Sequence, residues 1–156
     1  MSKHAFILSA GAICIACASL FAYAQTPGPL GAYQPALTDE LKARLKQADI
    51  AAGARFFERK CSQCHDGEKT GSHAKGPLLW NVFGRRAGSI AGFAFSPAMK
   101  AAGVTWDFAT LDDYLADTER AVPGRAMDFA GIPDAALRAA VVVYLSRLHD
   151  SPPPLP

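Results

Sequence analysis

The chain has 156 residues, of which 50% are hydrophobic and 19% charged. This length and composition suit one globular domain and leave little room for two. The 13 glycines and 11 prolines are ordinary counts, which exclude a collagen-like or low-complexity chain. Because 16 basic residues nearly balance 14 acidic ones, we do not expect a nucleic-acid binder that depends on bulk positive charge.

The first 24 residues have the pattern of a cleaved signal peptide. A short basic start is followed by an apolar run over residues 5–22, which is too short for a good membrane span. The sequence Ala22-Tyr23-Ala24 fits the small-x-small pattern that signal peptidase reads, which predicts cleavage after Ala24 and export to the periplasm. An uncleaved N-terminal anchor is the alternative.

The rest of the chain is predicted to be helical in several separate places. An N-terminal extension, residues 25–48, opens with a stretch at 25–29 that has no periodicity and is expected to be mobile. A tail at 150–156 contains four prolines and is expected to be non-helical. Apolar spacing predicts helices over residues 38–47, 50–60 and 105–117 and in the segment after Pro133.

The segment between Asp66 and Phe93 has neither a helical nor a strand period. Six glycines interrupt it, and a structureless stretch of this length is normally evidence against a compact fold. It becomes acceptable if the chain wraps a large apolar group that is not protein. The domain predicted over residues 49–149 therefore needs a cofactor as part of its core.

The motif Cys61-Ser62-Gln63-Cys64-His65 supplies that cofactor. Two thiols one helical turn apart can add to the two vinyl groups of a porphyrin edge, and the adjoining imidazole can bind iron. A thioredoxin-type redox pair would require a βαβ pattern, and none is visible. A zinc site would need two more ligands, for which only His73 and His149 are candidates. The motif predicts one haem c, covalently attached through Cys61 and Cys64, with His65 on the iron.

The sixth iron ligand decides between electron transfer and ligand-binding chemistry. Met127 follows an irregular Pro-Gly loop that could approach the open face of the ring. Met99 lies in a segment that reads as a short helix and is expected to pack in the core. His73, His149 and the lysines are the other candidates. A His65/Met127 pair is the prediction.

Further motifs follow one another in a fixed order over residues 49–149. They are Gly53 and Phe57, Gly76-Pro77-Leu78-Leu79-Trp80, Phe83-Gly84-Arg85-Arg86-Ala87-Gly88, Gly92-Phe93, Val104-Thr105-Trp106, Thr110-Leu111, Tyr114-Leu115, Pro123-Gly124 and Met127-Asp128-Phe129-Ala130-Gly131-Ile132. With the haem motif, they resemble the mitochondrial-type class I cytochromes c and their bacterial periplasmic relatives. The resemblance implies an all-α cytochrome c fold, with three to five helices and long irregular loops wrapped around one covalently bound haem.

The resemblance also implies roles for single residues. The Pro77 carbonyl should accept a hydrogen bond from His65, and Tyr114 should reach the sulfur of Met127. Arg85 and Trp106 should satisfy a buried haem propionate, because a desolvated anion needs donors.

Other positions of the resemblance concern packing, and some depart from the family. Gly53 should let the first and last helices of the domain cross closely, and His73 should tie loops together. Phe95 stands where the mitochondrial proteins usually have a tyrosine. Arg125 and Ala126 replace the usual Thr-Lys pair before the methionine.

Together these features predict a periplasmic monohaem electron carrier of a respiratory chain, not an enzyme. It would shuttle single electrons between a membrane or periplasmic donor, such as a quinol-oxidising complex, and a terminal oxidase or reductase. We expect a monomer with no nucleic-acid partner and at most transient membrane association. The alternative is a haem enzyme, or a gas or redox sensor, in which Met127 readily leaves the iron.

Charge is unevenly distributed along the sequence. Residues 55–100 hold eight basic and three acidic residues, whereas residues 101–150 hold four basic and eight acidic ones. Either the basic part surrounds the haem edge and attracts an acidic partner, or the asymmetry belongs to an ordinary solvated surface.

Overall fold

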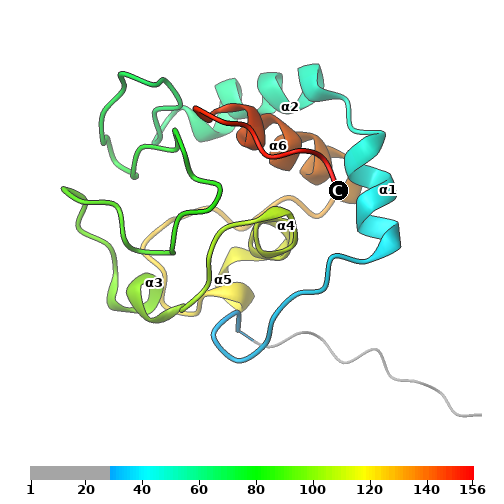
Figure 1. Ribbon diagram of the computed structural model, residues 1–156. Helices are drawn as coiled ribbons and strands as arrows, with labels where there is room; N and C mark the ends of the chain where they lie inside the picture. Colours follow the sequence, from blue (N-terminus) through cyan, green and yellow to red (C-terminus); the bar gives the residue numbers. More distant parts are fainter. Residues whose placement is uncertain (1–28) are drawn as a thin grey trace, which may run out of the picture.

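The computed structural model describes residues 29–156, and this part of the chain is helical (Figure 1). Its elements are α1 (Asp39–Lys46), α2 (Ile50–Phe56), a π-helical turn η1 (Phe57–Cys61), α3 (Pro97–Ala101), α4 (Phe108–Ala116), α5 (Thr118–Ala121) and α6 (Ala135–Arg147). The all-α prediction is confirmed, although the helices outnumber the three to five expected because α3 and α5 are single short turns of five and four residues.

β-Structure is almost absent from residues 29–156. The only β-bridge in this range is an isolated antiparallel one between Arg86 and Thr105. No helix in this range is long and apolar enough to cross a membrane. The predicted signal peptide and its cleavage site lie outside the described residues.

Side-chain caps explain where the helices begin. In each case a side-chain oxygen accepts a hydrogen bond from the backbone N–H three residues later, which satisfies a donor that the helix leaves free. The caps of the six α-helices are Thr38, Asp49, Ser96, Asp107, Asp117 and Asp134. The helix predicted over 105–117 starts later than expected because Asp107 and Thr110 form a capping box, which leaves Trp106 in extended chain.

The contact between α2 and α6 is the most extensive one between helices in residues 29–156. A Cβ atom added to Gly53 would lie 2.2 Å from the carbonyl oxygen of Ala140, so only glycine allows this approach. One turn further along, the rings of Phe57 and Tyr144 pack with their centroids 5.3 Å apart. The packing predicted for Gly53 is therefore observed.

A buried ion pair joins α4 to α6. Arg138 Nε lies 2.9 Å from Asp112 Oδ1, and each residue is only 8% exposed. The same guanidinium donates from Nη1 to the carbonyl of Ile132 at 2.7 Å. These bonds compensate the desolvation of both charges and hold the chain that enters α6 against α4.

The described part of the N-terminal extension is packed on the domain. Leu30 is 1% exposed, and its N–H donates to the Ala121 carbonyl at 2.9 Å. The Tyr33 hydroxyl donates to Asp113 Oδ1, which also pairs with Arg120 Nη2 at 2.8 Å. In Figure 1 this segment runs beneath α5 before it turns up into α1. The mobile stretch predicted at 25–29 lies almost wholly outside the described residues, and three leucines of the extension, Leu30, Leu41 and Leu45, belong to the core.

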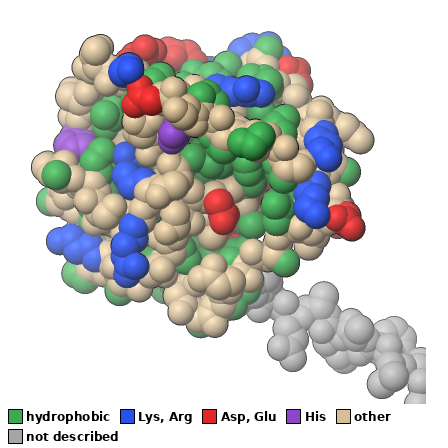
Figure 2. Space-filling model, viewed as in Figure 1, with side chains coloured by type: hydrophobic (Ala, Val, Ile, Leu, Met, Phe, Trp, Pro, Cys, Tyr) green, Lys and Arg blue, Asp and Glu red, His purple; other side chains and the backbone are tan. Residues whose placement is uncertain are grey.

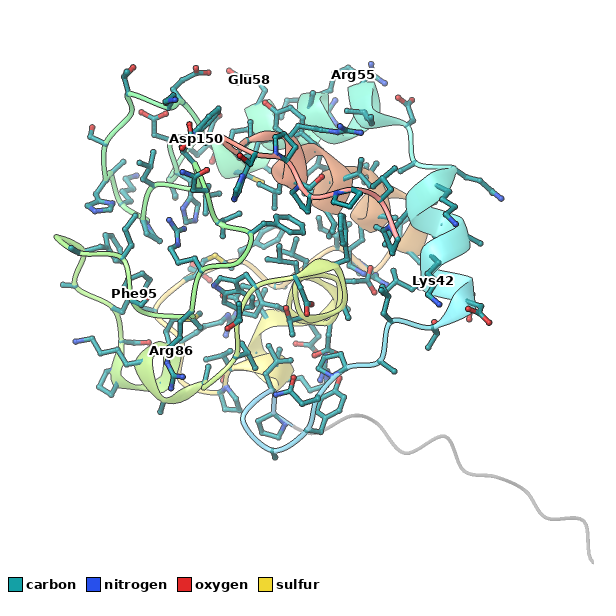
Figure 3. All side chains as sticks on the ribbon, viewed as in Figure 1. Lys42, Arg55, Glu58, Arg86, Phe95 and Asp150 are labelled. Atoms are coloured by element: carbon teal, nitrogen blue, oxygen red, sulfur yellow. The ribbon has the colours of Figure 1, made fainter. Side chains whose placement is uncertain are left out.

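The tail at 150–156 is non-helical, as predicted, and returns along α6 to end beside α1 (Figure 1). Its first residue, Asp150, accepts from Asn81 Nδ2 at 2.6 Å and donates its own N–H to Asn81 Oδ1 at 2.9 Å. The Asn81 N–H bonds to the carbonyl of Leu148 at 2.8 Å, and Lys69 Nζ lies 2.5 Å from Asp150 Oδ1. Asp150 thereby fastens the end of α6 to the irregular loops (Figure 3).

Replacing Asp150 by asparagine should reduce the acid dependence of stability. Hydrogen bonds from Lys69 and Asn81 hold the pKa of Asp150 at about 2, below its usual 3.8. Because the pKa is depressed in the folded state, this stabilisation is present above about pH 4 and is lost as the pH falls through about 2.

Denaturant unfolding of the holoprotein at a series of pH values from 2 to 6 measures the effect. The stability difference between wild type and Asp150→Asn should shrink as the pH falls from 4 to 2. Glu58→Gln is the matched control, because Glu58 is exposed on η1 and forms no ion pair within residues 29–156 (Figure 3). A difference that is constant across this range would contradict the prediction.

Candidate cofactor site

The π-helical turn η1 delivers the two cysteines and the histidine. Cys61 ends this turn, and its carbonyl accepts from the N–H groups of Cys64 and His65 at 3.0 and 2.9 Å. Both thiols are half-buried and are not joined to each other. Burial, and then the neighbouring Cys64, raise the pKa of Cys61 to about 11. The motif thus presents two unpaired thiols one turn apart, with the imidazole directly after them.

The imidazole of His65 is fixed from one side by the backbone. Its Nδ1 lies 2.7 Å from the Pro77 carbonyl, as predicted, so Nδ1 carries the proton and donates. The ring rests on Gly76, where an added Cβ would lie 2.4 Å from His65 Cε1. Burial lowers the pKa of His65, which favours the neutral ring. Nε2 is therefore left with a lone pair for a metal ion.

Met127 lies in the loop between α5 and α6, in contact with a tyrosine from α4. The Tyr114 hydroxyl is 3.9 Å from Met127 Sδ, which is the contact that the resemblance implied. Burial raises the pKa of Tyr114 to about 12, although the positive charge of Arg125 opposes this rise. The hydroxyl therefore stays protonated and can donate to the sulfur. The Trp106 ring packs on Tyr114 with centroids 5.2 Å apart.

Arg85 and Trp106 are brought side by side by backbone pairing. The Trp106 N–H donates to the Arg85 carbonyl at 2.9 Å. The Arg85 guanidinium donates to the carbonyls of Leu78 and Trp80, at 2.9 and 3.3 Å. Trp106 is 7% exposed, yet nothing within residues 29–156 accepts a hydrogen bond from its indole N–H. The indole nitrogen of Trp106 keeps some exposure, so it can still donate to an anionic group of a cofactor; the fully buried indole N–H without a partner in residues 29–156 is that of Trp80.

Two other predicted candidates have structural roles. Met99 lies in α3, where its N–H donates to Ser96 Oγ at 3.2 Å and its side chain packs against the core. His73 uses both ring nitrogens on the backbone, with Nε2 2.8 Å from the Ala91 carbonyl and Nδ1 3.0 Å from the Leu78 nitrogen. It ties two loops together, as predicted, and neither nitrogen is left for zinc.

The side chains described above fit a porphyrin better than a bare metal ion. Two thiols, a neutral imidazole, a thioether and an unpartnered indole N–H are what a covalently attached haem requires. A bare metal would require a cluster, and no group of three or more His, Cys, Asp or Glu suited to a metal ion occurs within residues 29–156.

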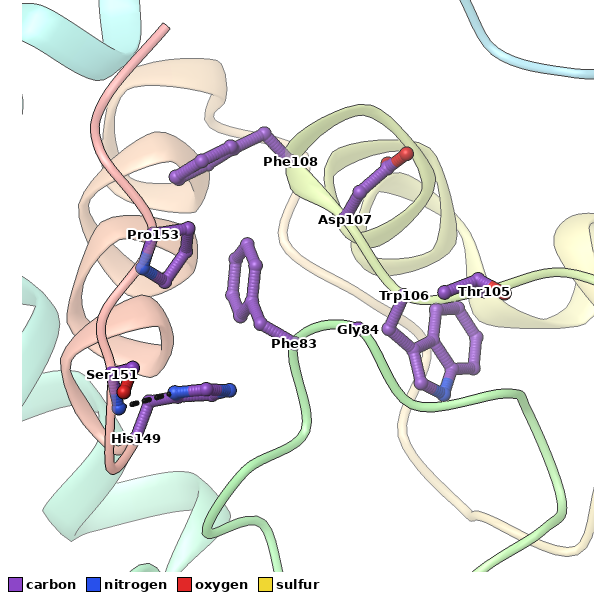
Figure 4. A pocket seen from close by; sticks show the side chains of 9 residues that line it. All are labelled: Phe83, Gly84, Thr105, Trp106, Asp107, Phe108, His149, Ser151 and Pro153. Atoms are coloured by element: carbon purple, nitrogen blue, oxygen red, sulfur yellow. Dashed lines mark hydrogen bonds between the residues drawn. The ribbon is translucent and has the colours of Figure 1, made fainter.

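A cavity of about 270 Å³ lies elsewhere, beneath the C-terminal tail. Figure 4 shows Pro153 of the tail facing Phe83 and Phe108, with the N–H of Ser151 bonded to His149. Trp106 borders this cavity, but neither His65 nor Met127 does. The cavity is therefore a packing gap between tail and core that meets the candidate site only at Trp106.

Sequence reasoning missed one feature of the site, the side chains that hold the methionine loop. Arg125 pairs with Glu119 of α5 and also donates to the Phe129 carbonyl at 3.3 Å. The only signal in the sequence was that Arg125 differs from the residue usual at this position in the family that the chain resembles. This difference does not identify Glu119 as its partner.

Comparison with known proteins gives consistent matches over the same region. Residues 50–148 match the sequence profile of the family described as Cytochrome c. Cytochrome c of Chlamydomonas reinhardtii is 44% identical over 105 residues, which cover 67% of this chain and 94% of that protein. A cytochrome c homolog of Bradyrhizobium diazoefficiens is 40% identical over 130 residues, 83% of this chain and 70% of that protein. Cytochrome c of Nigella damascena is 37% identical over 99 residues, 64% of this chain and 89% of that protein.

Proposed function

The chain belongs to the cytochrome c family, and from this premise we propose that it is a periplasmic monohaem electron carrier of a respiratory chain. Its cofactor is haem c, and like its relatives it is an electron-transfer protein, not an enzyme. The periplasmic location, the respiratory donor and acceptor, and the role of each site residue are parts of the proposal.

We assign the residues of the site as follows. Cys61 and Cys64 would hold the haem covalently, while His65 and Met127 would bind its iron. The hydrogen bond between His65 and the Pro77 carbonyl fixes the imidazole. When bound, the haem supplies a one-electron couple at its iron. The Arg85 guanidinium and the indole N–H of Trp106 would donate hydrogen bonds to a haem propionate, and the charge of Arg85 would offset that of the propionate.

The contact between Tyr114 and Met127 carries the proposal of a carrier. A thioether that is held by a hydroxyl donor 3.9 Å away, in a loop tied to α5 by the pair Arg125–Glu119, is not easily displaced. With His65 and Met127 both on the iron, the haem would have no open position for a substrate, and transfer would require only close approach of a partner. A gas or redox sensor would instead need a weakly held Met127.

Location and partners rest on other features. The signal-peptide pattern of residues 1–24 supports export, and covalent haem attachment takes place outside the cytoplasm. Arg59 and Lys60 are exposed directly before Cys61, which supports transient docking of an acidic partner near the haem motif. The face in Figure 2 shows Lys and Arg side chains scattered among acidic and apolar ones, with no single basic patch. A quinol-oxidising complex as donor and an oxidase or reductase as acceptor fit a monomeric shuttle.

The proposal is tested by following the holoprotein after expression with its own leader. The mature protein, starting at Gln25, should appear in the periplasmic fraction. Membranes supplied with quinol should reduce it, at a rate that falls as salt rises from low to physiological ionic strength. A full-length chain retained in the membrane, or a protein that membranes neither reduce nor oxidise, would contradict the proposal.

Carbon monoxide binding separates the carrier from the sensor. The reduced wild-type protein should bind carbon monoxide poorly, because Met127 keeps the sixth position. Binding as strong as that of a variant without the thioether would favour the sensor instead.

A further inference from the structure

Arg125 is an unusual side chain for a loop residue, because its charged group is almost buried. Only 11% of the side chain is exposed, two positions before Met127. Nη1 pairs with Glu119 Oε2, and Nη2 donates to the Phe129 carbonyl at 3.3 Å. The guanidinium therefore joins α5 to a backbone atom two residues beyond Met127, so that the methionine lies inside a closed loop.

Glu119 holds the other end of the same loop. Its second oxygen, Oε1, accepts from the N–H of Gly124 at 3.4 Å. The Phe129 carbonyl also accepts from the hydroxyl of Thr118, which is fully buried. Both ends of the segment 124–129 are thus fastened to α5. Without these bonds, Met127 would sit in a loop with few restraints on its backbone.

One hydrogen-bond donor of the Arg125 guanidinium has no protein partner within residues 29–156. Arg125 Nε is buried and has no hydrogen-bond partner within residues 29–156. The Glu119 side chain is 63% exposed, so water screens its negative charge much more than the positive charge of Arg125. A net positive field should therefore act on the buried side of this pair, where Met127 and Tyr114 lie.

We propose that Arg125 is the positioning residue of the sixth iron ligand, and that its buried charge favours the reduced iron. This inference rests on the proposed ligation by Met127. The clamp to Glu119 and Phe129 keeps the thioether in place against competing ligands. Reduction removes one positive charge from the iron, so a nearby guanidinium raises the reduction potential. Glu119 moderates this effect, because its charge opposes that of Arg125.

The test uses three loop variants and one control. Arg125→Gln removes both charge and clamp, Arg125→Lys keeps the charge but not the two-armed contact, and Glu119→Gln removes the opposing charge while keeping its shape. Arg86→Gln is the control, since it deletes an exposed positive charge elsewhere, beside α3 (Figure 3). For each holoprotein we would measure the reduction potential, the sulfur-to-iron charge-transfer absorption and the affinity of the oxidised iron for imidazole.

The two roles of Arg125 predict different results for the variants. Arg125→Gln should lower the potential and raise imidazole affinity about tenfold, the effect of losing one charge-assisted hydrogen bond. Arg125→Lys should raise imidazole affinity while the potential stays near that of the wild type. Glu119→Gln should raise the potential. Arg86→Gln should leave imidazole affinity unchanged and shift the potential less than Arg125→Gln does.

Failure of this inference and failure of the proposed ligation give different results. If the wild type shows the sulfur absorption and Arg125→Gln keeps both its potential and its imidazole affinity, Arg125 is only a structural residue. If the wild type lacks the absorption altogether, the ligation by Met127 is wrong, and the role of Arg125 falls with it. Should Arg125→Gln fail to fold, the rise in potential expected of the isosteric Glu119→Gln variant still decides the question of charge.

Discussion

Replacement of Met127 by leucine is expected to abolish the sulfur-to-iron charge-transfer absorption of the oxidised protein. It should also lower the reduction potential and open the iron to carbon monoxide. The physical reason is that leucine fills the space of the thioether but has no lone pair to donate. The haem should stay attached through Cys61 and Cys64, so acidified-solvent extraction should leave it with the denatured chain. Optical spectra and a redox titration of the purified holoprotein measure these effects.

Met99→Leu is the matched control for this substitution. Met99 lies in α3, where Ser96 caps the helix, and its side chain packs against the core. Exchange for the near-isosteric leucine should change stability by about 1 kcal/mol and leave the absorption in place. Loss of the absorption in Met99→Leu, with its retention in Met127→Leu, would reverse the ligand assignment without affecting the covalent haem.

Gly53→Ala is expected to be the most damaging single-methyl substitution in the fold. The added Cβ would lie 2.2 Å from the Ala140 oxygen, 2.6 Å from its carbonyl carbon and 3.1 Å from the Val141 nitrogen. These are backbone atoms, so no side-chain rotation can relieve the overlap and α2 must move away from α6. We expect a loss of at least about 4 kcal/mol in the free energy of unfolding, or failure to accumulate holoprotein. Denaturant unfolding measures the loss.

Two further variants show whether the overlap is the cause. Ala51→Gly places a glycine at an exposed position of the same helix and should cost only about 1 kcal/mol, through backbone entropy. Ala140→Gly should not rescue Gly53→Ala, because the overlap is with backbone atoms. If Gly53→Ala costs no more than Ala51→Gly, the close crossing does not matter for stability.

The helices and much of the candidate site could be predicted because their determinants are local in sequence. Thr38, Asp49 and Asp134 cap their helices through bonds that span three residues. The predicted start of α4 at residue 105 was wrong. The apolar residue Trp106 continues the helical spacing, but the capping box of Asp107 makes the helix begin at Phe108. Periodicity reports which side chains are apolar, whereas the cap decides where the backbone turns.

The haem motif was determined by the sequence alone, because its chemistry lies in five consecutive residues, Cys61 to His65, whose spacing along one turn is fixed by covalent geometry. Only the tertiary structure decided which long-range polar contacts hold the helices and loops of the domain together. The pairs Arg138–Asp112 and Tyr33–Asp113 join residues 26 and 80 positions apart. Arg125 closes the methionine loop only because α5 places Glu119 beside it. No short-range pattern encodes such contacts, since the stability of a buried charge depends on partners that chain folding brings together.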